Sequence, residues 1–304
     1  MKKAFTLIEL VIVITILAIL SSIGTDIFDR VYMNYVQTRS LQKLELETGI
    51  LIEQIAKRLE NRIKPTLAVS TYNGSNKNTG HKTLADAGNI DWKDNKTEIT
   101  WFNQMYETQR YNETNNRNIG WSGFINLESI KANGDTLTIT TPGSHLQTVL
   151  KEKYGKNNTP VLIFKGNDTD IADYYKVYDN YSSKYAHKIN IISDETFTID
   201  VRGKKPVKIY EQYWLAAYII GFRFVATDPT TKLKTLNYIE FPFSSEGGGT
   251  LMSKNVSSLN FKSTADNGVI VKLCLADPNF NLTPDEKDTN KKRYLEVCKT
   301  KVVL

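Results

Sequence analysis

The chain opens with a long run of apolar residues. From Phe5 to Ile23 the only residues that are not apolar are Glu9 and a few threonines and serines. A helix of this length rises about 28 Å, close to the thickness of the bilayer core. The pattern predicts a helix that crosses a membrane, and Lys2 and Lys3 before it favour a cytoplasmic N-terminus.

After Gly24 the apolar residues recur at intervals of three or four, with charged residues between them. No proline occurs before Pro65, so nothing in the sequence breaks a helix that begins at Phe5. We therefore expect residues 25–64 to form an amphipathic continuation that packs on a folded domain. A free coiled coil is the alternative, but the run lacks four regular heptads. The expected packing stripe contains Phe28, Val31, Tyr35, Leu41, Leu44, Ile52, Ile55, Leu59 and Ile63.

The rest of the chain reads as strands. Residues 70–96 are rich in Asn, Gly and Thr and predict a loop region. Beyond them, alternating and β-branched runs follow one another, each bounded by turn residues. We therefore expect an α+β fold in which a long N-terminal helix packs on an antiparallel sheet domain at residues 65–304. The expected strands are 97–102, 136–141, 160–164, 188–192, 196–201, 216–225, 235–243, 256–261, 269–275 and 293–304.

Composition adds few constraints. The 304 residues carry a formal charge of +6 without a dense basic stripe, so charge gives no support for a nucleic-acid partner. The chain has two cysteines, Cys274 and Cys298. After a membrane-targeting segment, an even number of cysteines fits an oxidising compartment and one disulfide, with two buried thiols as the alternative.

Glu9 is the residue that an ordinary membrane segment does not explain. An ionised carboxylate loses several kcal/mol when it leaves water, and an acid at the centre of an inserting helix costs about 3 kcal/mol. A secretory signal peptide cut near residues 22–24 gives no reason to keep it. Neither does a signal anchor that carries an unrelated outer domain.

Residues 2–20, KKAFTLIELVIVITILAIL, resemble the N-terminus of type IV prepilins and of the pseudopilins of type II secretion systems. The resemblance implies that a membrane peptidase removes residues 1–4 by cleaving between Ala4 and Phe5, after which Phe5 is N-methylated. Residues 5–24 are then the transmembrane half of the helix. The family usually has glycine before the cut, where this chain has Ala4. The resemblance also implies a pilin-like fold with a C-terminal disulfide loop.

This resemblance gives Glu9 a role in assembly. After cleavage, the amine of Phe5 is a cation in apolar surroundings, and Glu9 of a neighbouring subunit is an anion that can neutralise it. Such a pair sets the register of packed helices more than it stabilises them, because dehydration of both charges offsets their attraction.

The function implied is that of a filament subunit and not of an enzyme. Its partners would be other pilin-like subunits, the prepilin peptidase, an assembly platform in the bacterial inner membrane and lipid, with the sheet domain in the periplasm. The length is typical of a minor pilin or minor pseudopilin. Secretion, DNA uptake and adhesion or motility all stay open. The alternative is a periplasmic binding or enzymatic domain on a signal anchor.

One loop has the spacing of calcium ligands. Its oxygen-bearing residues are Asp277, Asn279, Asn281, Asp285 and Asp288. The residue after Asn281 is a leucine where calcium loops have a glycine, so an ordinary polar loop is the preferred interpretation. Calcium is the one candidate cofactor.

No other chemistry is indicated. The three histidines are scattered, and no catalytic or phosphate-binding motif occurs, so we expect no catalysis. We expect Trp92, Trp101, Trp121 and Trp214 in the core, and the stretch between Trp101 and Trp121 is the first place to look for a ligand contact.

Overall fold

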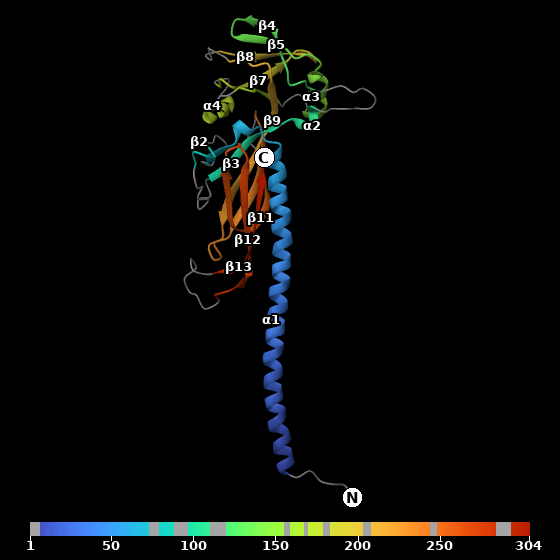
Figure 1. The fold of residues 1–304 in the computed structure, drawn as a ribbon, viewed down its shortest axis with the longest axis vertical. Helices are drawn as coiled ribbons and strands as arrows, with labels where there is room; N and C mark the ends of the chain where they lie inside the picture. Colours follow the sequence, from blue (N-terminus) through green and yellow to red (C-terminus); the bar gives the residue numbers. More distant parts are fainter. Residues whose placement is uncertain are drawn as a thin grey trace.

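The computed structural model describes residues 7–72, 79–87, 97–109, 120–154, 159–166, 170–178, 183–202, 208–243, 248–283 and 293–304. One long helix, α1 (Leu7–Glu60), carries a β-rich body at its C-terminal end (Figure 1). The N-terminal part of α1 extends far beyond this body as a bare rod. The expected α+β fold, with a long N-terminal helix packed on an antiparallel sheet, is confirmed.

Only the last part of α1 packs on the body. Its first buried residue is Ser40, and from there buried positions recur as far as Leu59. The expectation that the packing stripe begins just after Gly24 is wrong, because the 3.6-residue pattern marks an apolar face without saying what covers it. Phe28, Val31, Tyr35 and Leu41 of the expected stripe are exposed, whereas Leu44, Ile52, Ile55, Leu59 and Ile63 are buried.

The helix ends at Glu60, a few residues before the expected end. Pro65 lies in a short 3-10 turn, Lys64–Thr66, and a proline disfavours helical dihedrals in the residue before it. The backbone bonds that a longer helix would have made go to strand β3 instead: the N–H of Ile63 donates to the carbonyl of Phe102 at 2.9 Å. This pairing ties the end of α1 to the sheet.

Ten strands form a continuous path in the order β13-β12-β11-β10-β9-β6-β7-β8-β5-β4, and β3 joins it through β9. All pairs are antiparallel. The strands are β1 (Ala68–Thr71), β2 (Thr79–Thr83), β3 (Thr97–Gln104), β4 (Asn126–Asn133), β5 (Thr136–Thr140), β6 (Val161–Phe164), β7 (Ala186–Ile191), β8 (Thr196–Asp200), β9 (Tyr213–Thr227), β10 (Lys234–Pro242), β11 (Gly249–Ser263), β12 (Val269–Asn281) and β13 (Tyr294–Val303).

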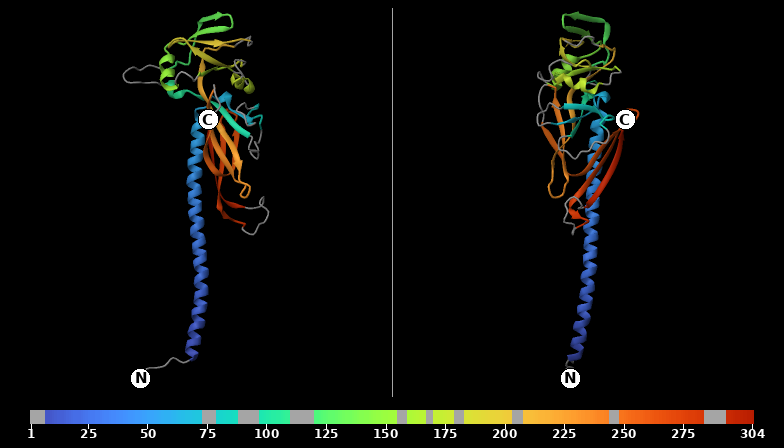
Figure 2. Two further views of the ribbon diagram at one scale, coloured as in Figure 1. Left: turned by 180° about the vertical axis from the view of Figure 1, so that it is seen from behind. Right: turned by 90° about the vertical axis from the view of Figure 1, so that its left-hand side faces the viewer.

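The body has a lower and an upper part along the axis of α1 (Figure 2). In the lower part, α1 lies on the sheet, with most of its contacts to β12 and β13. The upper part, farthest from the N-terminus, contains β4, β5, β7 and β8 together with the helices α2 (Tyr106–Gln109), α3 (Leu146–Tyr154) and α4 (Ile171–Tyr175). Strand β9 runs through both parts, which explains why its side chains are buried on both faces.

Candidate assembly site

The bare half of α1 is apolar enough to cross a membrane. An 18-residue window near its start is strongly hydrophobic, and none of that window is buried inside the protein. Leu7, Ile8 and Leu10, on either side of Glu9, expose 82%, 69% and 54% of their surface. In water, such a surface would be unfavourable, since the hydrophobic effect opposes exposure of a contiguous apolar patch of this size. The segment therefore needs lipid or another apolar surface around it.

Two threonine hydroxyl groups in this half form hydrogen bonds within the helix. Oγ1 of Thr15 donates to the carbonyl of Ile12 at 2.9 Å, and Oγ1 of Thr25 donates to the carbonyl of Ser22 at 2.8 Å. A polar group without a partner costs several kcal/mol in hydrocarbon. These internal bonds make threonine compatible with a membrane-spanning helix.

Glu9 lies in the first turn of α1. The N-terminal end of a helix carries a partial positive charge, which favours an acid at this position. The side chain is exposed on the surface of the rod and is therefore accessible to a neighbouring molecule. Ala4 and Phe5, the expected cleavage and methylation residues, lie outside the described residues.

Residues 1–25 match the sequence model of the prokaryotic N-terminal methylation motif. The chain carries a prepilin-type N-terminus. The motif supports a relationship to type IV pilins and pseudopilins and covers Glu9 together with the whole apolar run from Phe5 to Ile23. No curated protein and no solved structure matched the chain. The relationship of this prepilin-type chain to known proteins therefore rests on its first 25 residues.

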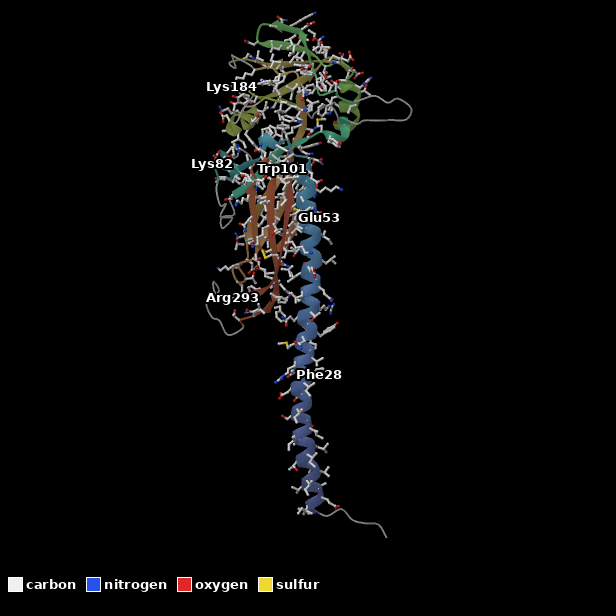
Figure 3. The ribbon with its side chains drawn as sticks, in the orientation of Figure 1. Phe28, Glu53, Lys82, Trp101, Lys184 and Arg293 are labelled. Carbon is white, nitrogen blue, oxygen red and sulfur yellow. A yellow bond between two sulfur atoms is a disulfide. The ribbon has the colours of Figure 1, made fainter. Side chains whose placement is uncertain are left out.

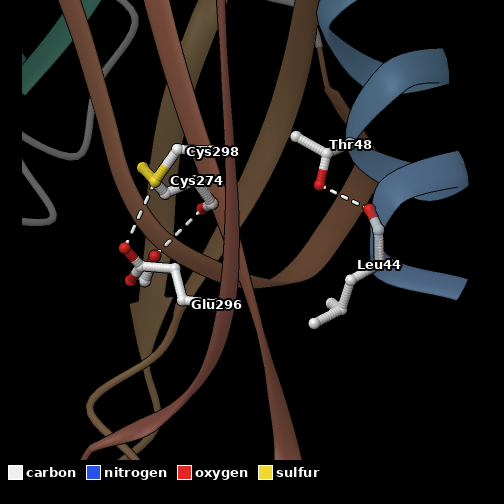
Figure 4. Close-up of a disulfide and its surroundings, with 6 residues drawn as sticks. Leu44, Thr48, Cys274, Glu296 and Cys298 are labelled. Atoms are coloured by element: carbon white, nitrogen blue, oxygen red, sulfur yellow. Dashed lines mark hydrogen bonds between the residues drawn. A yellow bond between two sulfur atoms is a disulfide. The ribbon is translucent and has the colours of Figure 1, made fainter. Parts of the chain in front are cut away.

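Cys274 and Cys298 are bonded to each other and pair directly across β12 and β13 (Figure 4). These are the two strands on which α1 packs. The Glu296 carboxylate approaches Sγ of Cys298 to 3.2 Å, which is a close contact, because a disulfide sulfur has no proton to donate. Among the described residues these three side chains form one group with the spacing of metal ligands. The disulfide removes both thiolates that a metal would need.

The candidate calcium loop is described only in part. Asp277, Asn279 and Asn281 belong to the end of β12, and Asp285 and Asp288 lie outside the described residues. The Asp277 carboxylate accepts bonds from Oγ of Ser40 at 2.5 Å and from the N–H of Asn279 at 2.9 Å. Oδ1 of Asn281 accepts a bond from the N–H of Thr283 at 2.9 Å. These oxygens therefore already have protein donors.

The tryptophans with described positions do not line a binding surface between them. Trp101 and Trp121 are buried, with 0% and 1% of their surface exposed, and they belong to separate parts of the core. Trp214 is partly buried and packs against a third part of the core. Trp92 lies outside the described residues. A ligand contact at Trp101 or Trp121 would require the core to open.

One buried charge pair was not predicted from the sequence. Arg223 on β9 donates from Nε to the Glu98 carboxylate on β3 at 2.7 Å, and the Tyr72 ring stacks on the guanidinium at 3.4 Å. Burial raises the pKa of Glu98, while Arg223 and a hydrogen bond from Ser70 act to lower it. The alternation of apolar and polar residues along β3 and β9 did not indicate this pair, because a charged residue in a strand usually faces solvent. The pair lies in the body, far from the bare half of α1, and we assign it a structural role.

Proposed function

We propose that this chain is a subunit of a type IV pilus-like filament or of a type II secretion pseudopilus, in a minor position. The observation that carries the proposal is the coincidence of three features at one place. A methylation motif, an exposed apolar helix and Glu9 all fall within the same segment of the chain.

The mechanism is assembly. The apolar half of α1 holds the subunit in the inner membrane, and the sheet domain lies in the periplasm, where the disulfide forms. Cleavage between Ala4 and Phe5 creates a new amine, and Glu9 of a neighbour neutralises it as the helices enter the filament. A buried acid and a buried amine each disfavour any packing that leaves them apart, so the pair selects one register.

The structure of the helix supports this use. Residues 7–39 rise about 50 Å, whereas the bilayer core needs only about 30 Å. Most of the remaining length is exposed, and it continues into the packed half without a break. A membrane anchor that serves only attachment does not need this extra length, whereas a filament whose core consists of packed helices does.

The first experiment is mass analysis of the mature protein purified from membranes, together with its N-terminal residue. We expect a chain that begins at Phe5 and is heavier by one methyl group. A chain that begins at Thr25 would show ordinary secretion, and an intact Met1 would show a signal anchor or failed processing at Ala4. Either result would contradict the proposal. A calcium titration of the same protein is a secondary measurement, because the loop that begins at Asp277 is the one candidate cofactor site.

A further inference from the structure

The disulfide between Cys274 and Cys298 joins the end strand of the sheet to its neighbour. In the described part of the sheet, β13 pairs with β12 on one side and with no strand on the other. The helix α1 packs on both strands, and Lys301 of β13 forms an ion pair with Glu53 of α1. Figure 3 shows Glu53 on this part of the helix and Arg293, the residue before β13, at the lower end of the body. The disulfide therefore fixes a strand that supports α1 and has a single neighbour in the sheet.

Only one of the two cysteines is open to solvent. Side chains alternate between the two faces of a strand, so Cys274 points away from Leu273 and Leu275, which belong to the core on which α1 packs. Cys274 is still buried, with 2% of its surface exposed, whereas Cys298 on the end strand is exposed. A reductant that approaches the folded protein therefore reaches Sγ of Cys298 first.

An acid lies beside the accessible sulfur. Residues two apart on a strand share a face, and the Glu296 carboxylate lies 3.2 Å from Sγ of Cys298 (Figure 4). Glu296 is itself exposed, and no cation among the described residues forms an ion pair with it. An exposed carboxylate is ionised at neutral pH. A full negative charge therefore lies next to the sulfur that a reductant must reach.

Thiols reduce a disulfide as thiolate anions. The attacking thiolate forms a bond to Sγ of Cys298, the bond between the two cysteine sulfurs breaks, and Cys274 leaves as a thiolate that takes a proton from water. A second thiol then displaces Cys298 from the mixed disulfide, so the two thiols supply both electrons and end as a disulfide. In the first step a negative charge arrives at the sulfur beside Glu296, and like charges at this separation repel each other.

We propose that Glu296 protects the disulfide by repelling thiolate reductants from Sγ of Cys298. In water, two unit charges about 4 Å apart interact strongly enough to change a rate about fivefold, and salt screens this effect. The protection keeps β13, and with it the surface under α1, in place where small thiols or dithiol reductases are present. The inference concerns the folded body and holds whether or not the chain enters a filament.

The rate of disulfide reduction in the full chain, solubilised in detergent, tests this role. Glu296→Gln removes the charge and keeps the size of the side chain, and labelling of the released thiols with a maleimide follows the reaction. With dithiothreitol at pH 8 and low salt, we expect Glu296→Gln to be reduced about fivefold faster than the unmodified chain. In about 1 M salt the difference should fall below about twofold.

Two controls separate charge from strand stability. Glu128→Gln removes an exposed acid from β4, the strand at the opposite end of the sheet path, and should leave the rate unchanged. An uncharged phosphine attacks the same sulfur and ends as a phosphine oxide with an oxygen from water, so it should reduce Glu296→Gln and the unmodified chain at equal rates. Faster reduction of Glu296→Gln by both reductants would show that the substitution loosens β13 and would overturn the proposal. So would a rate with dithiothreitol that is equal to or lower than that of the unmodified chain.

The unmodified chain allows a second test that does not require Glu296→Gln to fold. Cysteamine and 2-mercaptoethanesulfonate carry opposite charges beside the thiol, and their rates are first normalised on an uncharged small disulfide. At low salt, the positively charged cysteamine should then reduce the chain at least about threefold faster than the negatively charged thiol. Equal normalised rates, or a faster reaction with the negatively charged thiol, would overturn the proposal.

Discussion

The two halves of α1 have similar apolar periodicity but different surroundings. In residues 40–60 one face of the helix is buried against β12 and β13, and Ile55, Ala56 and Leu59 expose none of their surface. In residues 7–35 every residue is exposed, including the whole of the membrane-length window. Burial of apolar surface stabilises by about 25 cal/mol per Å² wherever water is removed. The packed half gains this within the chain, whereas the bare half can gain it only from lipid or from another molecule.

The difference separates folding from assembly. Substitutions in the packed half should change the free energy of unfolding of the sheet domain and leave the N-terminal contacts intact. Substitutions in the bare half should leave the domain folded and change what the chain binds. The largest effect of the second kind should come from Glu9, because it is an acid within an apolar surface.

Glu9→Ala should abolish incorporation into filaments, since the amine of Phe5 in the neighbouring subunit would lose its anion. The domain should stay folded, with the disulfide formed, because Glu9 lies in the first turn of the bare rod. Immunoblots of sheared filaments and of membranes measure the two outcomes. Asp26→Ala, which removes an acid beyond the apolar run, is the control and should assemble. Normal incorporation of Glu9→Ala would refute the register hypothesis.

Leu59→Ala and Leu46→Ala compare the two faces of the packed half. Leu59 is fully buried, so its truncation should cost about 2–5 kcal/mol of unfolding free energy through lost burial and a cavity. Leu46 is 65% exposed, and its truncation should stay within about 0.5 kcal/mol. Chemical denaturation of the detergent-solubilised chain measures both. A large loss of unfolding free energy for Leu46→Ala would show that the exposed face of the packed half contributes to the core of the domain.

Loss of the disulfide should weaken the surface on which the packed half lies. Cys274 and Cys298 are 24 residues apart, and a loop of this length contributes about 3–4 kcal/mol in the chain-entropy model. Cys274→Ser with Cys298→Ser should lower the unfolding midpoint, and a reductant should do the same to the unmodified chain. The reductant should have no further effect on the double variant. An unchanged midpoint in both experiments would show that the disulfide is not needed to hold β13.

Sequence reasoning succeeded where one pattern had one physical meaning. The membrane-length run and the long β-branched segments could be read directly, and ten expected strands correspond to strands in the structure. It missed β1, β2 and β4. Strand β1 has only four residues, AVST, and the sequences of β2 and β4, TGHKT and NLESIKAN, lack the alternation of a half-buried strand. Strand β4 is at the end of the sheet and exposed, so no core selected apolar residues there.

The boundary between the two halves of α1 could not be predicted for a similar reason. A 3.6-residue apolar period looks the same whether the covering surface belongs to the same chain or to another one. Tyr35 and Leu44 therefore received the same interpretation, and only the second is buried. The candidate assembly residue Glu9 was predicted because an acid is costly inside an apolar run and a simple membrane anchor does not need one. The pair formed by Glu98 and Arg223 was not, since its partners are 125 residues apart.

The smallest expected effect concerns the point where packing on the body begins. Ser40 is the first buried residue of α1, and its Oγ donates to the Asp277 carboxylate at the end of β12. Ser40→Ala should cost about 1 kcal/mol, a typical net value for one hydrogen bond, because Asp277 keeps the bond from the N–H of Asn279. Thr38→Ala is the matched control. Thr38 is exposed one half-turn earlier, so its truncation should change the unfolding free energy by less than about 0.5 kcal/mol. Equal losses of unfolding free energy in the two variants would show that packing of α1 on the body begins before Ser40, nearer the membrane. No loss in either variant would show that it begins later, near Leu44.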